Sequence, residues 1–169
     1  MPSSPVTPVI PVTPSPADPF APDDALTTQP VGYWTGRAHR AVTTRLRAAL
    51  ARVDVTQPQW QTMNRVDAPG GLPTRDQVIA QLTPTADGPH EISRVIDQLL
   101  HRGWLTAGPG DRLGLTDAGR AAKARIRELV TEVRAEVHEG VTDEEYVAAL
   151  RVLRRMITNA EGSGPPVQN

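Results

Sequence analysis

The sequence predicts a mainly α-helical fold with one small β-hairpin. Apolar residues recur at helical spacing in six separate segments, and a short Gly-rich segment at 105–115 has β-capable ends. The sequence does not alternate strand patterns with helix patterns, so a parallel sheet is not expected. The central segments follow one another as helix, turn, helix and hairpin, which is the order of a winged helix-turn-helix flanked by terminal helices.

The first helix is expected over 33–53, where Trp34, Val42, Leu46 and Leu50 keep to one face. Thr56 can cap a second helix, in which Pro58 sits early, where its missing N–H is harmless. A third helix is expected after its own cap at Thr74. Its inward positions are Val78, Ile79 and Leu82.

The fourth helix follows a seven-residue turn at 83–89 and is strongly amphipathic. Its inner stripe is Ile92, Val95, Ile96, Leu99 and Leu100, and its outer residues are His90, Glu91, Arg94, Asp97, Gln98 and His101. A hairpin is expected over 105–115, with Gly-Pro-Gly-Asp at its tip. Such a helix backed by a hairpin is typical of proteins that place a helix in a DNA groove.

Two further helices close the domain. Thr116 or Asp117 caps the fifth, which runs to about His138, and the capping box at 142–145 begins the sixth. The helices at 32–53 and 117–160 carry apolar stripes that the central motif is too short to cover, so we expect a two-fold homodimer. The candidate dimer-interface residues are Trp34, Val42, Val133, Val137, Tyr146, Leu150, Leu153 and Ile157.

The domain is expected over 31–160, between a Pro-rich disordered leader at 1–30 and a disordered tail at 161–169. Five leader prolines recur every third residue from Pro2 to Pro14, as on one edge of a polyproline II helix. A docking site for a Pro-binding partner is the alternative to a plain leader. The leader lacks the basic start and apolar run of a signal peptide, so a cytoplasmic protein is expected.

Composition excludes several chemistries. Cysteine is absent, and the four histidines lack metal-ligand spacing, so neither a metal nor a cofactor is expected. A Gly-rich phosphate loop, a nucleophile elbow and a convincing pair of carboxylates are also missing, so the sequence does not predict an enzyme.

The net charge of −1 conceals a segregated distribution. Residues 31–73 carry +4 and residues 74–127 carry +2, whereas residues 128–145 carry −6. Such a chain can present a basic face to phosphates while it stays near neutral overall. All but one of the 18 basic residues are arginine, which suits phosphate contacts. A GC-rich genome is an alternative source of this bias toward arginine.

The ordered elements resemble the MarR family of bacterial transcriptional regulators (multiple antibiotic resistance regulators). The likeness rests on five phrases in order, at 56–60, 92–99, 102–104, 111–112 and 115–120, and covers roughly 31–160. It implies a DNA-binding lobe at about 56–116, a homodimer on a pseudo-palindromic operator, frequent repressor action, and weakening of DNA binding by a small aromatic effector. The hairpin departs from the family because it is short and lacks a second Arg after Arg112.

Arg94 and Gln98 lie one turn apart on the outer face of the fourth helix and could contact guanine and adenine. Glu91 could accept from cytosine or repel the DNA backbone. The full set of candidate DNA-contacting residues is Arg75, His90, Glu91, Ser93, Arg94, Gln98, Asp111 and Arg112. The alternative is an ordinary solvated face on which Arg94 pairs with Asp97 or with an Asp at another turn.

Trp34, His39, Trp60 and Met63 fall on the two helices that line an effector cavity in the resembled family. Plain core packing is the stronger interpretation of these four residues. The sequence therefore predicts a sequence-specific DNA-binding regulator, with a winged helix that binds only proteins as the alternative.

Overall fold

The computed structural model describes residues 26–88 and 90–162. The described residues divide into two compact units at residues 43 and 44, and this boundary falls inside helix α2 (Val31–Ala51). This helix begins and ends two residues earlier than predicted. In the first unit the Trp34 indole donates to the Gln29 side chain at 2.6 Å. Most of the predicted leader, residues 1–25, lies outside the described residues.

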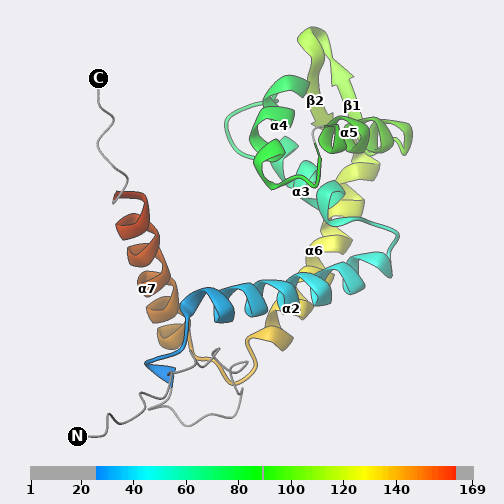
Figure 1. Ribbon diagram of the computed structural model, residues 1–169. Helices are drawn as coiled ribbons and strands as arrows, with labels where there is room; N and C mark the ends of the chain where they lie inside the picture. The colour runs from blue at the N-terminus through cyan, green and yellow to red at the C-terminus, as the bar shows by residue number, and fades with distance from the viewer. Residues whose placement is uncertain (1–25, 89, 163–169) are drawn as a thin grey trace, which may run out of the picture. The chain divides into compact units, whose positions relative to one another are not determined.

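Helices α3 (Gln57–Val66), α4 (Arg75–Leu82) and α5 (Glu91–His101) form the centre of the second unit (Figure 1). Thr56 and Thr74 are the N-caps of α3 and α4, as predicted. Each begins a capping box, because the side chain of a glutamine three residues later accepts a hydrogen bond from the cap's backbone N–H. The turn before α5 contains a short 3₁₀ helix, Thr83–Thr85.

The core lies between these helices and the hairpin. Ile92, Val95, Ile96 and Leu99 of α5 are buried, as the apolar stripe predicts, whereas Leu100 is half-buried at its edge. Side chains from every neighbouring element complete the cluster, among them Leu50, Val55, Met63, Val66, Val78, Leu105, Leu113, Leu115, Ala122 and Ile126. Burial of this one stripe directs the opposite, polar side of α5 outward.

The predicted hairpin consists of β1 (Leu105–Gly108) and β2 (Arg112–Leu115), which pair antiparallel with Leu105 opposite Leu115. Gly110 and Asp111 turn the tip with positive φ angles of 68° and 56°. The Leu113 N–H also donates to the Pro73 carbonyl at 2.9 Å. This bond ties the hairpin to the segment that leads into α4.

Helix α6 (Asp117–Val137) begins at Thr116, whose hydroxyl accepts from the Gly119 N–H at 3.0 Å. Gly119 packs directly on the backbone carbonyl of Trp104, where a β-carbon would not fit. The glycine in the Leu-Thr-Asp-Ala-Gly phrase therefore lets α6 approach the exit of α5 closely.

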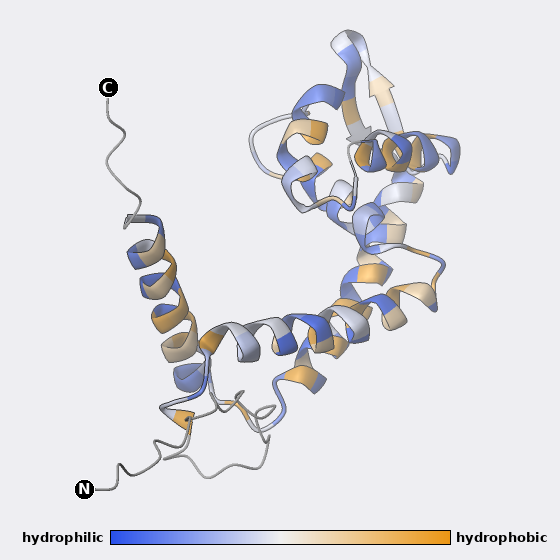
Figure 2. Ribbon diagram, in the orientation of Figure 1, coloured by the Kyte–Doolittle hydropathy of each residue, from blue (hydrophilic) through white to orange (hydrophobic). Residues whose placement is uncertain are grey.

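Helix α7 (Asp143–Gly162) begins at the predicted capping box, in which the Glu145 carboxylate accepts from the Thr142 N–H at 2.8 Å. Apolar and polar bands alternate along its length (Figure 2). All of its residues are exposed except Tyr146 and Leu153, which are half-buried. Residues 163–169 of the predicted tail lie outside the described residues. Among the helices that are described, none combines the length and apolarity needed to cross a membrane.

Candidate nucleic-acid interface

The polar side of α5 is the candidate interface. Its central line consists of His90, Arg94, Asp97 and His101, which are all exposed. Ser93 and Gln98 flank this line on opposite sides, because they lie about 140° apart around the helix. The neighbouring helices α4 and α3 each reach one of these flanks.

Arg75 holds the α4 side. Its guanidinium donates to the backbone carbonyl of Ser93 at 3.1 Å and to the Ser93 hydroxyl at 2.9 Å, and it lies 2.8 Å from the Asp97 carboxylate. With its side chain 23% exposed, Arg75 is already engaged with three acceptors of α5. Contact of Arg75 with the DNA backbone stays a prediction, and in the structure its guanidinium ties the start of α4 to α5.

Gln59 holds the α3 side, where its amide nitrogen donates to the Gln98 side-chain oxygen at 3.1 Å. Gln59 is buried with 6% exposure, whereas Gln98 is exposed. Sequence reasoning did not single out Gln59. A signal was present nonetheless, because Thr-x-x-Gln is a capping-box pattern that fixes where the glutamine side chain points.

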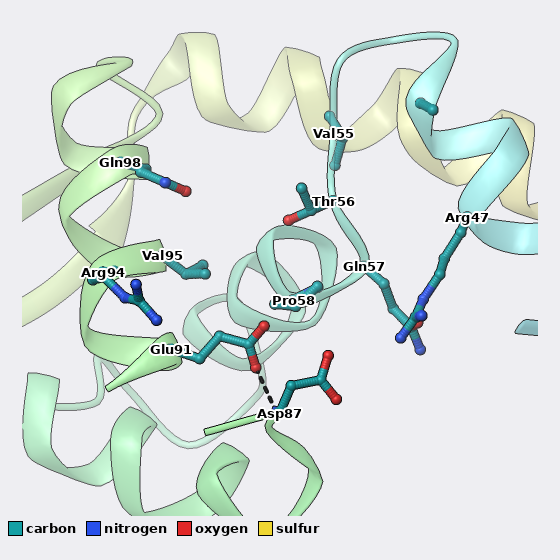
Figure 3. Close-up of a pocket in the computed structure, with 11 residues that line it drawn as sticks. Arg47, Val55, Thr56, Gln57, Pro58, Asp87, Glu91, Arg94, Val95 and Gln98 are labelled. Carbon is teal, nitrogen blue, oxygen red and sulfur yellow. Dashed lines mark hydrogen bonds between the residues drawn. The ribbon is translucent and has the colours of Figure 1, made fainter. Parts of the chain in front are cut away.

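A recess of about 480 Å³ lies beside this flank. Figure 3 shows Arg94 and Glu91 of α5 reaching into it from one side and Arg47 of α2 from the other. The Arg47 guanidinium donates to Gln57 at 2.9 Å. The recess therefore carries charges of both signs over an apolar floor that includes Val95 and Pro58.

Glu91 has a structural role at the start of α5. Its carboxylate accepts the Asp87 backbone N–H at 2.8 Å, the bond drawn in Figure 3. His90, the N-cap residue, makes no side-chain cap bond. Glu91 thus closes the turn and places a negative charge in the first helical turn, where the helix dipole favours it.

Arg94 is exposed, and among the residues that the structure describes its Nε has a long contact of 3.4 Å with the His90 carbonyl. The solvated-face interpretation paired Arg94 with Asp97, but Asp97 pairs with Arg75 instead. The Arg94 guanidinium therefore combines exposure with donors that can turn toward a base edge.

The hairpin contributes Asp111 and Arg112, both exposed near its tip. The Arg112 guanidinium donates to the Leu72 carbonyl at 2.8 Å, so it already has a partner within the lobe. Contact between Arg112 and DNA would compete with this bond or add to it through the remaining donors of the fork.

The residues suggested for an effector site are divided by the structure. Met63 is fully buried and Trp60 packs against the same core cluster, which favours the core-packing interpretation for both. Trp34 is half-buried and His39 is exposed, and both lie in the first unit.

The suggested dimer residues also differ in accessibility. Leu150, Ile157 and Val137 are exposed, as is Val42 of α2, whereas Val133 is 6% exposed and is covered within the chain itself. The ring of Tyr146 lies 4.6 Å from that of His138 and under the Arg134 guanidinium, so its packing begins inside the protomer.

These elements define a winged helix: the three helices α3, α4 and α5 and a two-stranded hairpin, with the polar side of α5 exposed. Neither a protein-family model nor a curated protein matches the sequence. Solved structures do match. The reduced form of MarR from E. coli is 19% identical, with a TM-score of 0.63 over 79% of this chain and 98% of that one.

Two further similar structures are complexes of the Mycobacterium tuberculosis MarR family protein Rv2887. The complex with DNA is 21% identical with a TM-score of 0.61, over 76% of this chain and 98% of that chain. The complex with p-aminosalicylic acid is 20% identical with a TM-score of 0.59, over the same shares. The chain therefore has the MarR-type winged-helix fold.

Proposed function

We propose that this protein is a sequence-specific DNA-binding transcriptional regulator. The exposed polar side of α5 carries the proposal, because the fold buries the opposite side and both flanks are braced by buried or half-buried side chains. Arg94 and Gln98 enter the major groove and contact base edges, while Arg112 approaches the flanking minor groove. The complex of the similarly folded Rv2887 with DNA supports this role.

The regulator acts as a homodimer. Helix α7 exposes Val147, Leu150 and Ile157 on one side, and an exposed apolar side of a helix favours a partner chain. A two-fold dimer presents two α5 helices to half-sites about one helical turn apart. Sedimentation at micromolar concentration measures the mass directly, and a monomer there removes the pseudo-palindromic operator from the proposal.

We also propose that the protein acts as a repressor and that a small aromatic effector lowers its affinity for DNA. The support is the p-aminosalicylic acid complex of Rv2887. The proposal predicts that such an acid releases bound DNA at concentrations that leave the fold intact. Titration of an operator complex with p-aminosalicylic acid is the direct measurement.

Selection of bound DNA from a random library, followed by titration at several salt concentrations, tests the central proposal. A regulator selects a consensus, and its affinity falls by about 10³ or more between 50 and 200 mM salt if six or more phosphates are contacted. Arg94→Ala then relaxes one base position per half-site, at a cost of about 1–3 kcal/mol. Absent or salt-insensitive binding favours a winged helix that binds only proteins.

A further inference from the structure

Gln59 connects the first turn of α3 to the candidate DNA-reading side of α5. Its side-chain oxygen accepts from the Thr56 backbone N–H at 3.0 Å, and its side-chain nitrogen donates to the Gln98 oxygen at 3.1 Å. The side chain is 94% removed from solvent, since its exposed fraction is 6%. A buried amide is costly to leave unpaired, so both bonds resist exchange with water.

The direction of these bonds follows from elementary chemistry. A backbone N–H can only donate, so the Gln59 atom that faces Thr56 must be the oxygen. The nitrogen of Gln59 then faces Gln98, and because an NH₂ group can only donate, Gln98 must offer its own oxygen. The orientation of both side-chain amides is therefore set by the Thr56 backbone N–H, which can act only as a hydrogen-bond donor.

One consequence concerns the exposed end of Gln98. With its oxygen directed to Gln59, its NH₂ group is the part left facing outward. A glutamine without such a partner can turn either its side-chain oxygen or its NH₂ group toward a base. The NH₂ group of Gln98 is already directed outward before DNA binds. Pre-orientation of this kind lowers the entropy lost on binding and selects among partners.

We infer that Gln59 is a positioning residue that makes Gln98 a hydrogen-bond donor toward DNA. This inference rests on the proposed function. In the major groove guanine offers O6 and N7, thymine offers O4 and adenine offers N7, whereas cytosine presents only the N4 donor. The base edge that Gln98 contacts is therefore guanine, thymine or adenine, and cytosine is disfavoured there.

Gln59→Glu tests the inference because it reverses the second bond and keeps the first. Glutamate is also a capping-box residue, so one carboxylate oxygen continues to accept from Thr56. The other oxygen now faces Gln98 and can only accept, so the Gln98 amide turns over and exposes its oxygen. The base preference at one position per half-site then extends to cytosine, whose N4 donor the exposed oxygen can accept.

Gln77→Glu is the matched control. Gln77 occupies the same position in the capping box of α4, where its oxygen accepts from the Thr74 N–H at 2.9 Å. It adds the same negative charge to the same lobe, but on an exposed side chain. This control lowers affinity for all sequences to a similar degree and leaves the selected bases unchanged.

Selection from a random library compares the three proteins. Gln59→Glu is expected to enrich cytosine, the base that the wild type disfavours, about tenfold or more at one position, since a good base contact discriminates by about 1–3 kcal/mol. Weaker binding of every sequence with the original base preference, as in the control, overturns the inference.

A second measurement needs no DNA. In ¹H–¹⁵N spectra the Gln98 side-chain NH₂ resonates as a solvated amide in the wild type and shifts, with slower exchange, when it donates to the new carboxylate. An unchanged Gln98 NH₂ signal in Gln59→Glu overturns the positioning role. If the signal responds but the wild type selects no DNA sequence, the positioning role stands, and base selection fails together with the proposed function.

Discussion

Replacing Gly119 by alanine is expected to destabilise the lobe, although alanine is the better helix former. Gly119 lies in the first turn of α6, and a β-carbon there would stand 2.9 Å from the Trp104 carbonyl carbon and closer still to its oxygen. Ordinary contacts between carbon atoms are about 3.5–4.0 Å. The clashing atoms belong to the Trp104 backbone and cannot rotate away as a flexible side chain could. Helix α6 or the end of α5 must therefore move by a distance on the order of 1 Å.

The magnitude follows from two opposing effects. Overpacking costs about 1–3 kcal/mol, and a clash with backbone belongs at or above the upper end. The gain in helix propensity is at most about 1 kcal/mol. We expect a net loss of about 2 kcal/mol in the free energy of unfolding, which lowers the Tm by roughly 4–8 °C for a chain of this size.

Urea unfolding followed by circular dichroism measures this change. Gly32→Ala is the matched control, because Gly32 is also helical but a β-carbon there meets nothing within 4 Å. The control is expected to change stability by less than about 1 kcal/mol. If Gly119→Ala unfolds at the wild-type urea concentration or above it, with an unchanged m-value, the close approach of α6 to Trp104 is refuted.

Two further predictions concern Arg75, which is bonded to α5, and Glu145 in the capping box of α7. Arg75→Ala changes stability by less than about 1 kcal/mol, since its ion pair is near the surface, but it weakens DNA binding by freeing Asp97 on the interface. A salt dependence shallower by about one unit would instead make Arg75 a phosphate contact. The pKa of Glu145 is held below its ordinary 4.5 by hydrogen bonds from the Thr142 backbone and side chain. The α7 cap is therefore fully present above that value and lost as the pH falls through the lowered pKa. The chemical shift of the Thr142 backbone amide reports the titration of Glu145, and this pH dependence should disappear in Glu145→Gln. A midpoint at pH 4.5 or above contradicts the capping role of Glu145.

The sequence by itself determined the elements and the two sides of α5. Apolar spacing located the helices, and Thr56, Thr74 and the 142–145 box placed three of their starts, because periodicity and capping are local properties. For α6 the sequence left Thr116 and Asp117 as alternatives, and the structure shows Thr116 as the cap. The same spacing separated the buried stripe of α5 from its polar side, where Arg94 and Gln98 lie.

Only the tertiary structure decided what that polar side is bonded to. Arg75 and Gln59 belong to two different helices, and the packing of α5 between them directs one to Asp97 and the other to Gln98. It likewise placed Met63 in the core and Arg112 beside the Leu72 carbonyl. Partners far apart in the chain depend on how helices cross, and crossing is set by side-chain packing that no local pattern records.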